Sequence, residues 1–388
     1  SGRRSGALMA DNLKTPNPVP NPVPSPRAGV LDLPAYVGGR ESVEGIENPY
    51  KLSANENPLG PSPKAVAAIQ ALAAEADLAI YPDGGARQLR AKLAQVNGLK
   101  AEQIVCGNGS GDVLQLLAQA YLEAGDEVLY TEHGFLLYKL ASTSAGATPI
   151  CVAETNRTAD VDALLAKVSE KTKIVFLANP NNPTGTMLPM EEISRLHAGL
   201  ASDVLLVLDG AYAEYVAPEK WPADFAMVEQ FSNVVATRTF SKAYGLAALR
   251  LGWAYCPPGV ADALNRVRGP FNVNAMALAG GLAALEDPAH IETSRAHNAQ
   301  WRDWLGQQLG ALGYEIKASE ANFIVLDFGT AEMASAADAF LCRQGVIARG
   351  LAAYAMPTAL RLTVGTQEGN RAAVDALQAF QQQAGAAL

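Results

Sequence analysis

The chain has 388 residues, of which 49% are hydrophobic and 18% charged, enough for one large and one smaller domain. Its net charge of −9 argues against nucleic acid or an anionic membrane surface as a partner. No apolar run approaches the length of a membrane span, and no apolar segment typical of a signal peptide follows the basic first residues. We therefore expect neither a nucleic-acid partner nor a membrane partner.

The first 30 residues are predicted to be a disordered, proline-rich tail. Proline occupies every second position from Pro16 to Pro26, a pattern that favours polyproline II or disorder. We interpret it as a solvated extension, with a ligand for a proline-binding module as the alternative. Residues 31–85 are expected to form an N-terminal arm and part of the small domain, with a helix at about 63–76 that begins near Pro63.

Residues 86–285 alternate short apolar runs with helical segments, including a helix at 112–122. Strands are predicted at 103–106, 127–130, 173–178, 204–208 and 234–237, and a further one near 252–256. Continuous apolar strands separated by helices are typical of a buried, mostly parallel sheet. The fold class is therefore α/β, a doubly wound sheet with helices on both faces, and this segment is the large domain.

Residues 286–388 are expected to contain a linking helix and a small α+β domain. Helical sequence runs from about Ala275 to Leu309 and should break or kink at Pro288. Strands are predicted at 322–326 and 360–364.

The cysteines and histidines show no spacing that suits a metal. The four cysteines include no C-x-x-C pair, and the four histidines lack metal-ligand spacing. We expect no metal site, no disulfide framework and a reducing, cytoplasmic location.

A lysine among small hydroxyl residues, Lys242, is the strongest candidate for chemistry. Burial and nearby cations lower the pKa of a lysine, so that its neutral amine can attack a carbonyl. Thr239, Ser241 and Arg250 surround it in the sequence and carry groups that bind phosphate. Taken alone, this segment also fits a solvated loop.

Three further strand ends carry polar groups. Ser110 and Gly111 lie in a Gly-rich loop that opens a helix and aims N–H groups at an anion, although Ser110 or Asp112 also fits a simple helix cap. Asn182 follows the strand at 173–178, where its amide could bind a phenolic oxygen. Because ligands of such sheets bind beyond the strand ends, these segments and Lys242 together predict a pyridoxal phosphate (PLP) site.

The strand at 204–208 ends in Asp209, with Tyr212 three residues later. A carboxylate beside a pyridinium nitrogen keeps the ring protonated and electron-withdrawing, which PLP chemistry requires. Tyr212 is a candidate donor to the ring oxygen.

From about Leu33 to its C-terminus the chain resembles fold-type I, class I/II PLP-dependent aminotransferases, and within them the histidinol-phosphate aminotransferase family. The motifs lie at 55–60, 81–83, 179–185, 239–252, 271–274 and 360–366. The resemblance implies a large domain with a mostly parallel seven-stranded sheet between helices, a small α+β domain, and PLP as cofactor. It also implies a homodimer in which Tyr81 reaches the neighbouring subunit's cofactor.

The resemblance also implies roles for single residues. Lys242 would be the Schiff-base lysine and proton shuttle, with Asp209 at the ring nitrogen and Tyr212 at the ring oxygen. The rest of the cofactor site would be Ser110, Gly111, Phe135, Asn182, Thr239, Ser241 and Arg250. Arg361 would hold a substrate carboxylate in a bidentate pair. The other implied substrate contacts are Tyr36, Asn55, Asn272 and Arg349.

The implied reaction is amino transfer from L-histidinol phosphate to 2-oxoglutarate, giving imidazole acetol phosphate and L-glutamate in histidine biosynthesis. The chain departs from the family's usual pattern at Gly111-Asp112, Gly210 and Gly350, where Asp-Glu, Glu and a bulkier residue are usual. The departures at Gly210 and Gly350 keep an aromatic amino acid, phenylalanine or tyrosine, as an alternative donor. A PLP decarboxylase of a phosphorylated amino acid and a non-enzymatic regulator are the remaining alternatives.

Overall fold

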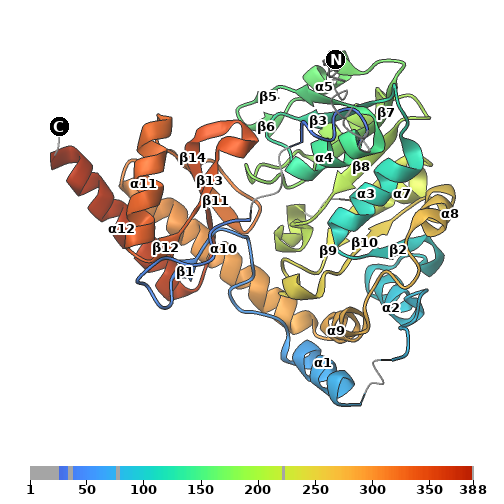
Figure 1. The fold of residues 1–388 in the computed structure, drawn as a ribbon, viewed down its shortest axis with the longest axis horizontal. Helices are drawn as coiled ribbons and strands as arrows, with labels where there is room; N and C mark the ends of the chain where they lie inside the picture. The colour runs from blue at the N-terminus through green and yellow to red at the C-terminus, as the bar shows by residue number, and fades with distance from the viewer. Residues whose placement is uncertain (1–25, 34–37, 76–78, 221–222, 387–388) are drawn as a thin grey trace, which may run out of the picture.

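The computed structural model describes residues 26–33, 38–75, 79–220 and 223–386 (Figure 1). Most of the proline-rich tail therefore lies outside the described residues. The largest element is a seven-stranded sheet in the order β2-β10-β9-β8-β7-β3-β4. Its strands are β2 (Ile104–Gly107), β3 (Glu127–Thr131), β4 (Thr148–Val152), β7 (Thr172–Ala178), β8 (Leu205–Asp209), β9 (Val234–Thr239) and β10 (Gly252–Tyr255). Only β10 runs antiparallel to its neighbours in this sheet, which confirms the predicted, mostly parallel architecture.

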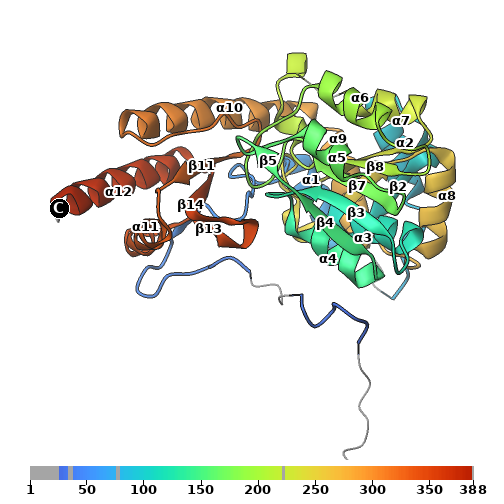
Figure 2. The ribbon, with the colours of Figure 1, turned by 90° about the horizontal axis from the view of Figure 1, so that it is seen from above.

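Alternate side chains of the central strands pack into two separate cores. In β7, Val175 and Leu177 belong to the first core, whereas Ile174 and Phe176 belong to the second. In Figure 2, α6 and α7 lie above the strands, and α3 and α4 lie below them. The first core is covered by α2 (Arg87–Asn97), α5 (Val161–Lys167), α6 (Met190–Ala198), α7 (Asp224–Gln230) and α9 (Ala275–Leu285). The second is covered by α3 (Ser110–Tyr121), α4 (Leu136–Ala145) and α8 (Pro258–Val267).

A smaller, antiparallel sheet has the order β11-β14-β13. It consists of β11 (Phe323–Asp327), β14 (Met356–Thr363) and β13 (Arg349–Leu351), with α11 (Ala331–Arg343) and α12 (Gln367–Ala386) beside it. The N-terminal arm reaches this part of the chain, because β1 (Tyr50–Lys51) pairs with β12 (Val346–Ile347). The arm also carries α1 (Pro63–Glu75), which packs on α9, while β5 (Glu154–Thr155) and β6 (Thr158–Ala159) form a hairpin.

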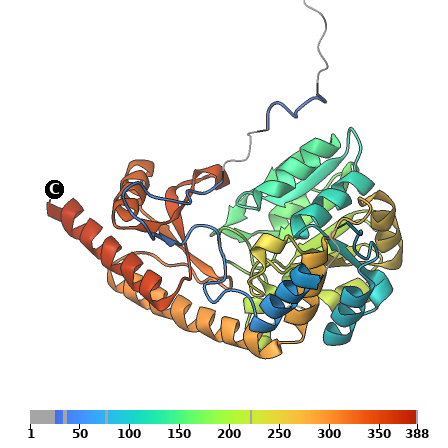
Figure 3. The ribbon, with the colours of Figure 1, turned by 60° about the horizontal axis from the view of Figure 1, so that its bottom comes forward.

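A long helix, α10 (Pro288–Ala311), connects the two sheets. It begins close to α9 and runs to the smaller sheet, where it lies beside α12 (Figure 3). The helix α9 ends at Leu285 and α10 begins at Pro288, so the predicted break is present. The domain boundaries at residues 30, 85 and 285 stay a prediction. Within the described residues, no helix has both the length and the apolarity needed to cross a bilayer.

Candidate active site

Polar side chains gather where the strands of the large sheet end. Asp209 is the last residue of β8, Asn182 follows β7, and Lys242 follows β9. Ser110 begins α3, shortly after β2. Because parallel strands end at the same edge of a sheet, these positions from distant parts of the sequence share one edge.

An anion-binding cradle lies between the N-terminus of α3 and the segment after β9. The N–H groups and positive dipole end of α3 begin at Ser110. Gly252 in β10 permits this turn to approach, because a Cβ there would lie 2.1 Å from the Ser110 nitrogen. Arg250 donates from Nη1 to the Ser241 hydroxyl over 3.0 Å, and its Nη2 would lie 2.6 Å from a Cβ at Gly109. The cradle thus combines helix N–H groups, a hydroxyl and a guanidinium, which suits a phosphate.

The two other predicted cradle residues lie in the same segments. Thr239 ends β9, and its Oγ1 accepts a hydrogen bond from the Ser241 backbone over 3.1 Å. Gly111 lies in the first turn of α3, where a Cβ would come within 3.0 Å of Leu137. Small residues therefore shape both sides of the cradle.

Asp209 is buried and accepts two hydrogen bonds from hydroxyl groups. Tyr138 donates to Oδ2 over 2.9 Å, and Thr237 donates to Oδ1 over 3.0 Å. Burial raises the pKa of Asp209, while the bonds from Tyr138 and Thr237 and the charge of Arg238 oppose that rise. Phe135 packs edge-on against Tyr138, with the ring centroids 5.9 Å apart.

Tyr212 follows Asp209 on the turn after β8 and is also buried. Its hydroxyl accepts a hydrogen bond of 2.8 Å from the side-chain amide of Asn55. Asn55 is anchored in turn by Thr363 of β14, whose Oγ1 accepts the backbone N–H over 3.0 Å. Burial raises the pKa of Tyr212 to about 12, so its hydroxyl is protonated at neutral pH.

Lys242 carries an amine whose pKa lies near neutral pH. Its Nζ donates to the Ala54 carbonyl over 3.0 Å. Burial, followed by the positive charges of Arg361 and Arg250, lowers the pKa of Lys242 to about 7 against the opposing charge of Glu56. A lysine with this pKa can give up and take back a proton at neutral pH.

Arg361 is buried on β14 and faces the same site. It donates to the Asn182 Oδ1 and, over 2.9 Å, to the Ser53 carbonyl. Its Nε and the Ser53 Oγ are buried without a hydrogen-bond partner. Arg349 lies directly opposite Arg361 in the β13–β14 pair. Two neighbouring guanidinium groups with an unused donor favour an anionic substrate.

Three of the predicted residues are not part of this cluster as described. Tyr81 is 75% exposed and stacks on Phe271 with ring centroids 4.5 Å apart. Asn272 donates to the Cys106 carbonyl over 3.1 Å. Tyr36 lies outside the described residues.

Sequence reasoning missed the neighbours that hold Asp209. Thr237 lies two residues before Thr239 in β9, so the alternation of side chains along a strand would have placed the two threonines on one face. Tyr138 comes from α4, a helix that the sequence analysis did not predict. Arg238 lies between the two threonines on the opposite face. No three His, Cys, Asp or Glu side chains cluster as metal ligands in the described part of the chain.

Comparison with known proteins agrees with this arrangement. Residues 47–377 match the family model for aminotransferase class I and II. A histidinol-phosphate aminotransferase of Dinoroseobacter shibae is 52% identical over 92% of this chain and 98% of its own length. One of Paramagnetospirillum magneticum is 51% identical over the same shares. The crystal structure of histidinol-phosphate aminotransferase from Sinorhizobium meliloti in complex with pyridoxal-5'-phosphate has a TM-score of 0.84 and 27% identity, over 93% of this chain and 99% of that one. The chain therefore belongs to the class I and II aminotransferases and, among them, to the histidinol-phosphate aminotransferase family.

Proposed function

We propose that this chain transfers the amino group of L-histidinol phosphate to 2-oxoglutarate, forming imidazole acetol phosphate and L-glutamate. As a class I and II aminotransferase it is a PLP-dependent transaminase. The proposal rests on the surroundings of Lys242. Burial and the positive charges of Arg361 and Arg250 lower its pKa, and the same two arginines suit anionic groups. The names of the two relatives support the choice of substrate.

The residues at the sheet edge fit PLP. A Cβ at Gly109 would collide with the Arg250 guanidinium, and one at Gly252 would collide with the Ser110 nitrogen, so the shape of the anion cradle requires both glycines. The residues that would hold the phosphate are Ser110, Gly111, Thr239, Ser241 and Arg250. Those that would meet the ring are Asp209 at its nitrogen, Asn182 and Tyr212 at its oxygen, and Phe135 on its face. When bound, PLP supplies a carbonyl that condenses with amines and a ring that withdraws electrons.

Lys242 moves the proton in the reaction that we propose. With a pKa of about 7, its Nζ is largely neutral slightly above neutral pH and accepts the proton from the substrate carbon that carries the amino group. The same Nζ would then donate that proton to C4′, the carbon of the cofactor that carries its carbonyl group. Tyr212, with its pKa raised to about 12, remains a hydrogen-bond donor throughout.

Arg361 and Arg349 bind the anionic ends of the substrates. The two arginines are cross-strand neighbours, so both positive charges attract anionic groups to the same part of the site. We assign the α-carboxylate of 2-oxoglutarate and glutamate to Arg361, and the phosphate of histidinol phosphate to Arg349. Asn55, Asn272 and Tyr36 are the further substrate contacts that we propose.

One departure from the family pattern concerns packing rather than substrate choice. A Cβ at Gly210 would lie 2.2 Å from the Arg238 guanidinium, which is on the core side of the sheet. Gly350 is exposed, and a Cβ there would contact nothing within 4 Å. Because Gly210 packs against Arg238 and Gly350 faces solvent, neither departure favours an aromatic amino acid as the donor.

Absorbance of the PLP-loaded protein tests the proposal. Without a keto acid, a substrate amine converts the coloured cofactor form to a colourless one in a single half-reaction. We expect bleaching at low concentrations of L-histidinol phosphate and only at much higher concentrations of L-phenylalanine. The reverse order would establish the aromatic alternative. Release of carbon dioxide from an added phosphorylated amino acid, without formation of a keto acid, would establish the decarboxylase. Lys242→Ala is the control and should not turn over with either amine.

We further propose a homodimer in which Tyr81 completes the partner's site. Tyr81 and Phe271 are both exposed aromatic residues in contact, as in a surface that another chain covers. Consider a heterodimer of one Tyr81→Ala chain and one Lys242→Ala chain. One of its two sites has both an intact Lys242 and an intact Tyr81 only if Tyr81 acts across the interface. Co-expressing the inactive Lys242→Ala chain with the weakened Tyr81→Ala chain, so that hybrids form, should therefore restore activity. Activity that stays at the average of the two would contradict shared sites.

We also propose that the protein is cytoplasmic. All four cysteines, Cys106, Cys151, Cys256 and Cys342, are free, which agrees with a reducing compartment. Fractionation of the native cells, followed by immunodetection, tests this location.

A further inference from the structure

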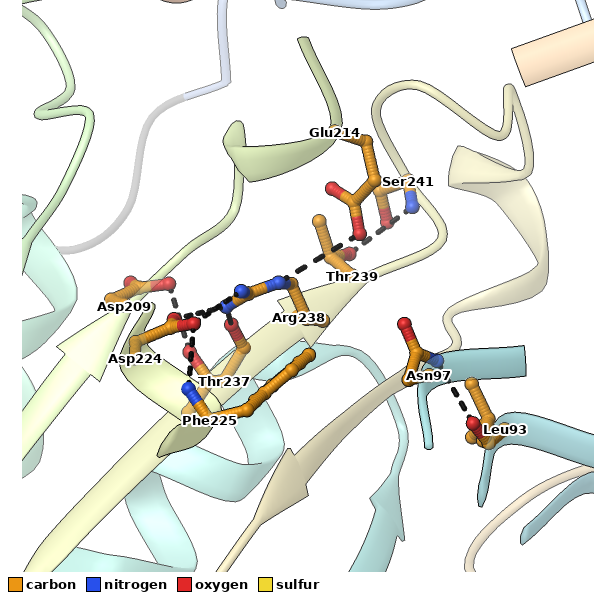
Figure 4. A network of polar contacts seen from close by, with 10 residues as sticks. All are labelled: Leu93, Asn97, Asp209, Glu214, Asp224, Phe225, Thr237, Arg238, Thr239 and Ser241. Carbon is orange, nitrogen blue, oxygen red and sulfur yellow. Dashed lines mark hydrogen bonds and ion pairs between the residues drawn. The ribbon is translucent and has the colours of Figure 1, made fainter. Parts of the chain in front are cut away.

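Arg238 is an arginine buried beside the candidate active site, with only 1% of its surface exposed. Its guanidinium bonds Asp224 of α7, with Nη1 2.8 Å from one carboxylate oxygen and Nη2 2.9 Å from the other. Glu214 lies 4.0 Å away, and the Phe225 ring lies 4.4 Å below the guanidinium carbon (Figure 4). A buried charge is costly, so its retention beside a site calls for an explanation.

Arg238 and Asp209 occupy opposite faces of the sheet at neighbouring strand ends. Leu208 and Ala236 belong to the first core, so alternation turns Asp209 away from that core and Arg238 toward it. Thr237, which is opposite Asp209 in the β8–β9 register, connects the two. Its hydroxyl donates to the Asp209 carboxylate, and its carbonyl accepts from Arg238 Nη1 over 2.9 Å (Figure 4).

Gly210 leaves the space that the guanidinium occupies. A Cβ at this position would lie 2.2 Å from Nη1 and 2.8 Å from Cζ of Arg238. Gly210 does not have the left-handed backbone conformation that favours glycine, so the close guanidinium is the reason for its small size. The Gly210 N–H also donates to the Thr237 carbonyl over 3.1 Å. Arg238 therefore fixes the point where the chain leaves β8 for the turn that carries Tyr212.

We propose that Arg238 is a positioning residue for Asp209. It secures the end of β8 and places, on the opposite face of the sheet, a positive charge that favours the ionised form of the Asp209 carboxylate. The inference rests on the proposed function, in which Asp209 meets the pyridine nitrogen of PLP.

The charges and hydroxyls around both groups agree with this role. Asp209 is faced by the hydroxyls of Tyr138 and Thr237, and burial raises its pKa while Arg238 lowers it. Arg238 is faced by Asp224, Glu214 and the Tyr244 hydroxyl. Burial raises the pKa of Glu214 to about 7, so Glu214 is only partly charged at neutral pH, and Asp224 holds the guanidinium through two contacts of 2.8 and 2.9 Å.

A charge-balanced double variant tests the proposal. Arg238→Met with Asp224→Asn removes one positive and one negative buried charge together, a type of change that folded cores tolerate. The dissociation constant of PLP is measured at pH 6 and pH 8, with the thermal midpoint of the PLP-free protein as the check on folding. The matched control is Arg266→Met with Asp262→Asn, which removes an exposed pair on α8.

Without Arg238, Asp209 should take up a proton as the pH falls and lose its attraction for a protonated pyridine. We expect the ratio of the dissociation constants, pH 6 over pH 8, to rise relative to the wild type, by at most about tenfold for each unit by which the Asp209 pKa rises. The control should keep the wild-type ratio. Adding Asp209→Asn to the double variant should abolish the extra pH dependence, because the group that titrates is gone. A loss of packing alone would weaken binding equally at both pH values.

A folded double variant with the wild-type ratio would overturn the inference. If the double variant does not fold, the same two dissociation constants are measured for Gly210→Ala. Its new Cβ displaces the Arg238 guanidinium without changing the net charge. A raised ratio in Gly210→Ala then supports the inference, and an unchanged ratio overturns it. A wild-type protein that binds no PLP at either pH would contradict the proposed function instead.

Discussion

The side-chain amide of Asn55 donates a hydrogen bond of 2.8 Å to the hydroxyl of Tyr212, 157 positions away in the chain. Asn55 is 2% exposed and Tyr212 is 3% exposed, so bulk water cannot replace this bond. Because Asn55 is also bonded to Thr363, the arm, the turn after β8 and the smaller sheet meet at this one bond.

Tyr212→Phe should destabilise the protein more than the same change three residues on. Removing the Tyr212 hydroxyl leaves the buried Asn55 amide with one donor unpaired, at a cost of about 1–3 kcal/mol. The matched control is Tyr215→Phe, since the buried Tyr215 hydroxyl lies near Asn322 but makes no well-aligned hydrogen bond. Urea denaturation of the PLP-free variants measures both changes. Equal losses of stability would show that the Asn55 bond contributes nothing particular.

The rate at which PLP attaches to the PLP-free protein should follow the neutral form of Lys242. Since the pKa of Lys242 is lowered to about 7, the rate should rise through pH 7 and level off above it. An unperturbed lysine would still be accelerating at pH 9. Stopped-flow absorbance between pH 6 and pH 9 measures the profile. Lys242→Ala should lack this phase, and a midpoint above pH 9 would contradict the lowered pKa.

Gly252→Ala should damage the anion cradle. Its Cβ would lie 2.1 Å from the Ser110 nitrogen and 2.5 Å from the Gly109 carbonyl carbon, both backbone atoms that cannot rotate away. We expect a loss of about 1–3 kcal/mol from overpacking, and weaker PLP binding, because the N-terminus of α3 is displaced. The control is Gly259→Ala in α8, where a Cβ contacts nothing within 4 Å and should stabilise the helix by up to about 1 kcal/mol. Calorimetry and PLP titration distinguish the two.

Glu214→Gln should stabilise the protein at pH 8 and leave it unchanged near pH 5. Burial raises the pKa of Glu214 to about 7, and its Oε2 has no hydrogen-bond partner beside a cavity of about 130 Å³. A carboxyl whose pKa is raised by folding binds its proton more tightly when folded, so stability is lost as the pH rises through 7. At about 1.4 kcal/mol per pKa unit, the variant's advantage should approach about 3 kcal/mol at pH 8. An equal effect at both pH values would show that Glu214 does not titrate in this range.

The buried strands could be predicted because their sequences are almost continuously apolar. All five residues of β8 and all six of β9 are buried; β8 is apolar up to Asp209, and β9 begins with the apolar run 234–236. The strand β4 was not predicted, because it is an edge strand that is mostly half-buried or exposed and contains Pro149. Its residues thus lack both the apolar run and the strict alternation on which strand prediction depends.

The positions of the site residues at strand ends could also be predicted, whereas their contacts could not. Asp209 and Lys242 follow directly from where the apolar runs stop. The bonds from Tyr138 to Asp209 and from Arg361 to Asn182 join residues 71 and 179 positions apart. Such contacts arise from how helices and the smaller sheet pack on the large one, and no local pattern in a single sequence records that packing.

The helix α10 spans the distance between the two sheets as a single rigid rod of 24 residues. Near its start, Ser294 accepts a hydrogen bond from Asn57, and its far half packs Trp301, Leu305 and Leu309 into the core of the smaller sheet. At 1.5 Å per residue the rod is about 36 Å long, so a tilt of about 5° at its start moves its far end by about 3 Å. A small rotation at the base of α10 would therefore move β14, and with it Arg361, relative to Lys242 on the large sheet by up to about the length of a hydrogen bond.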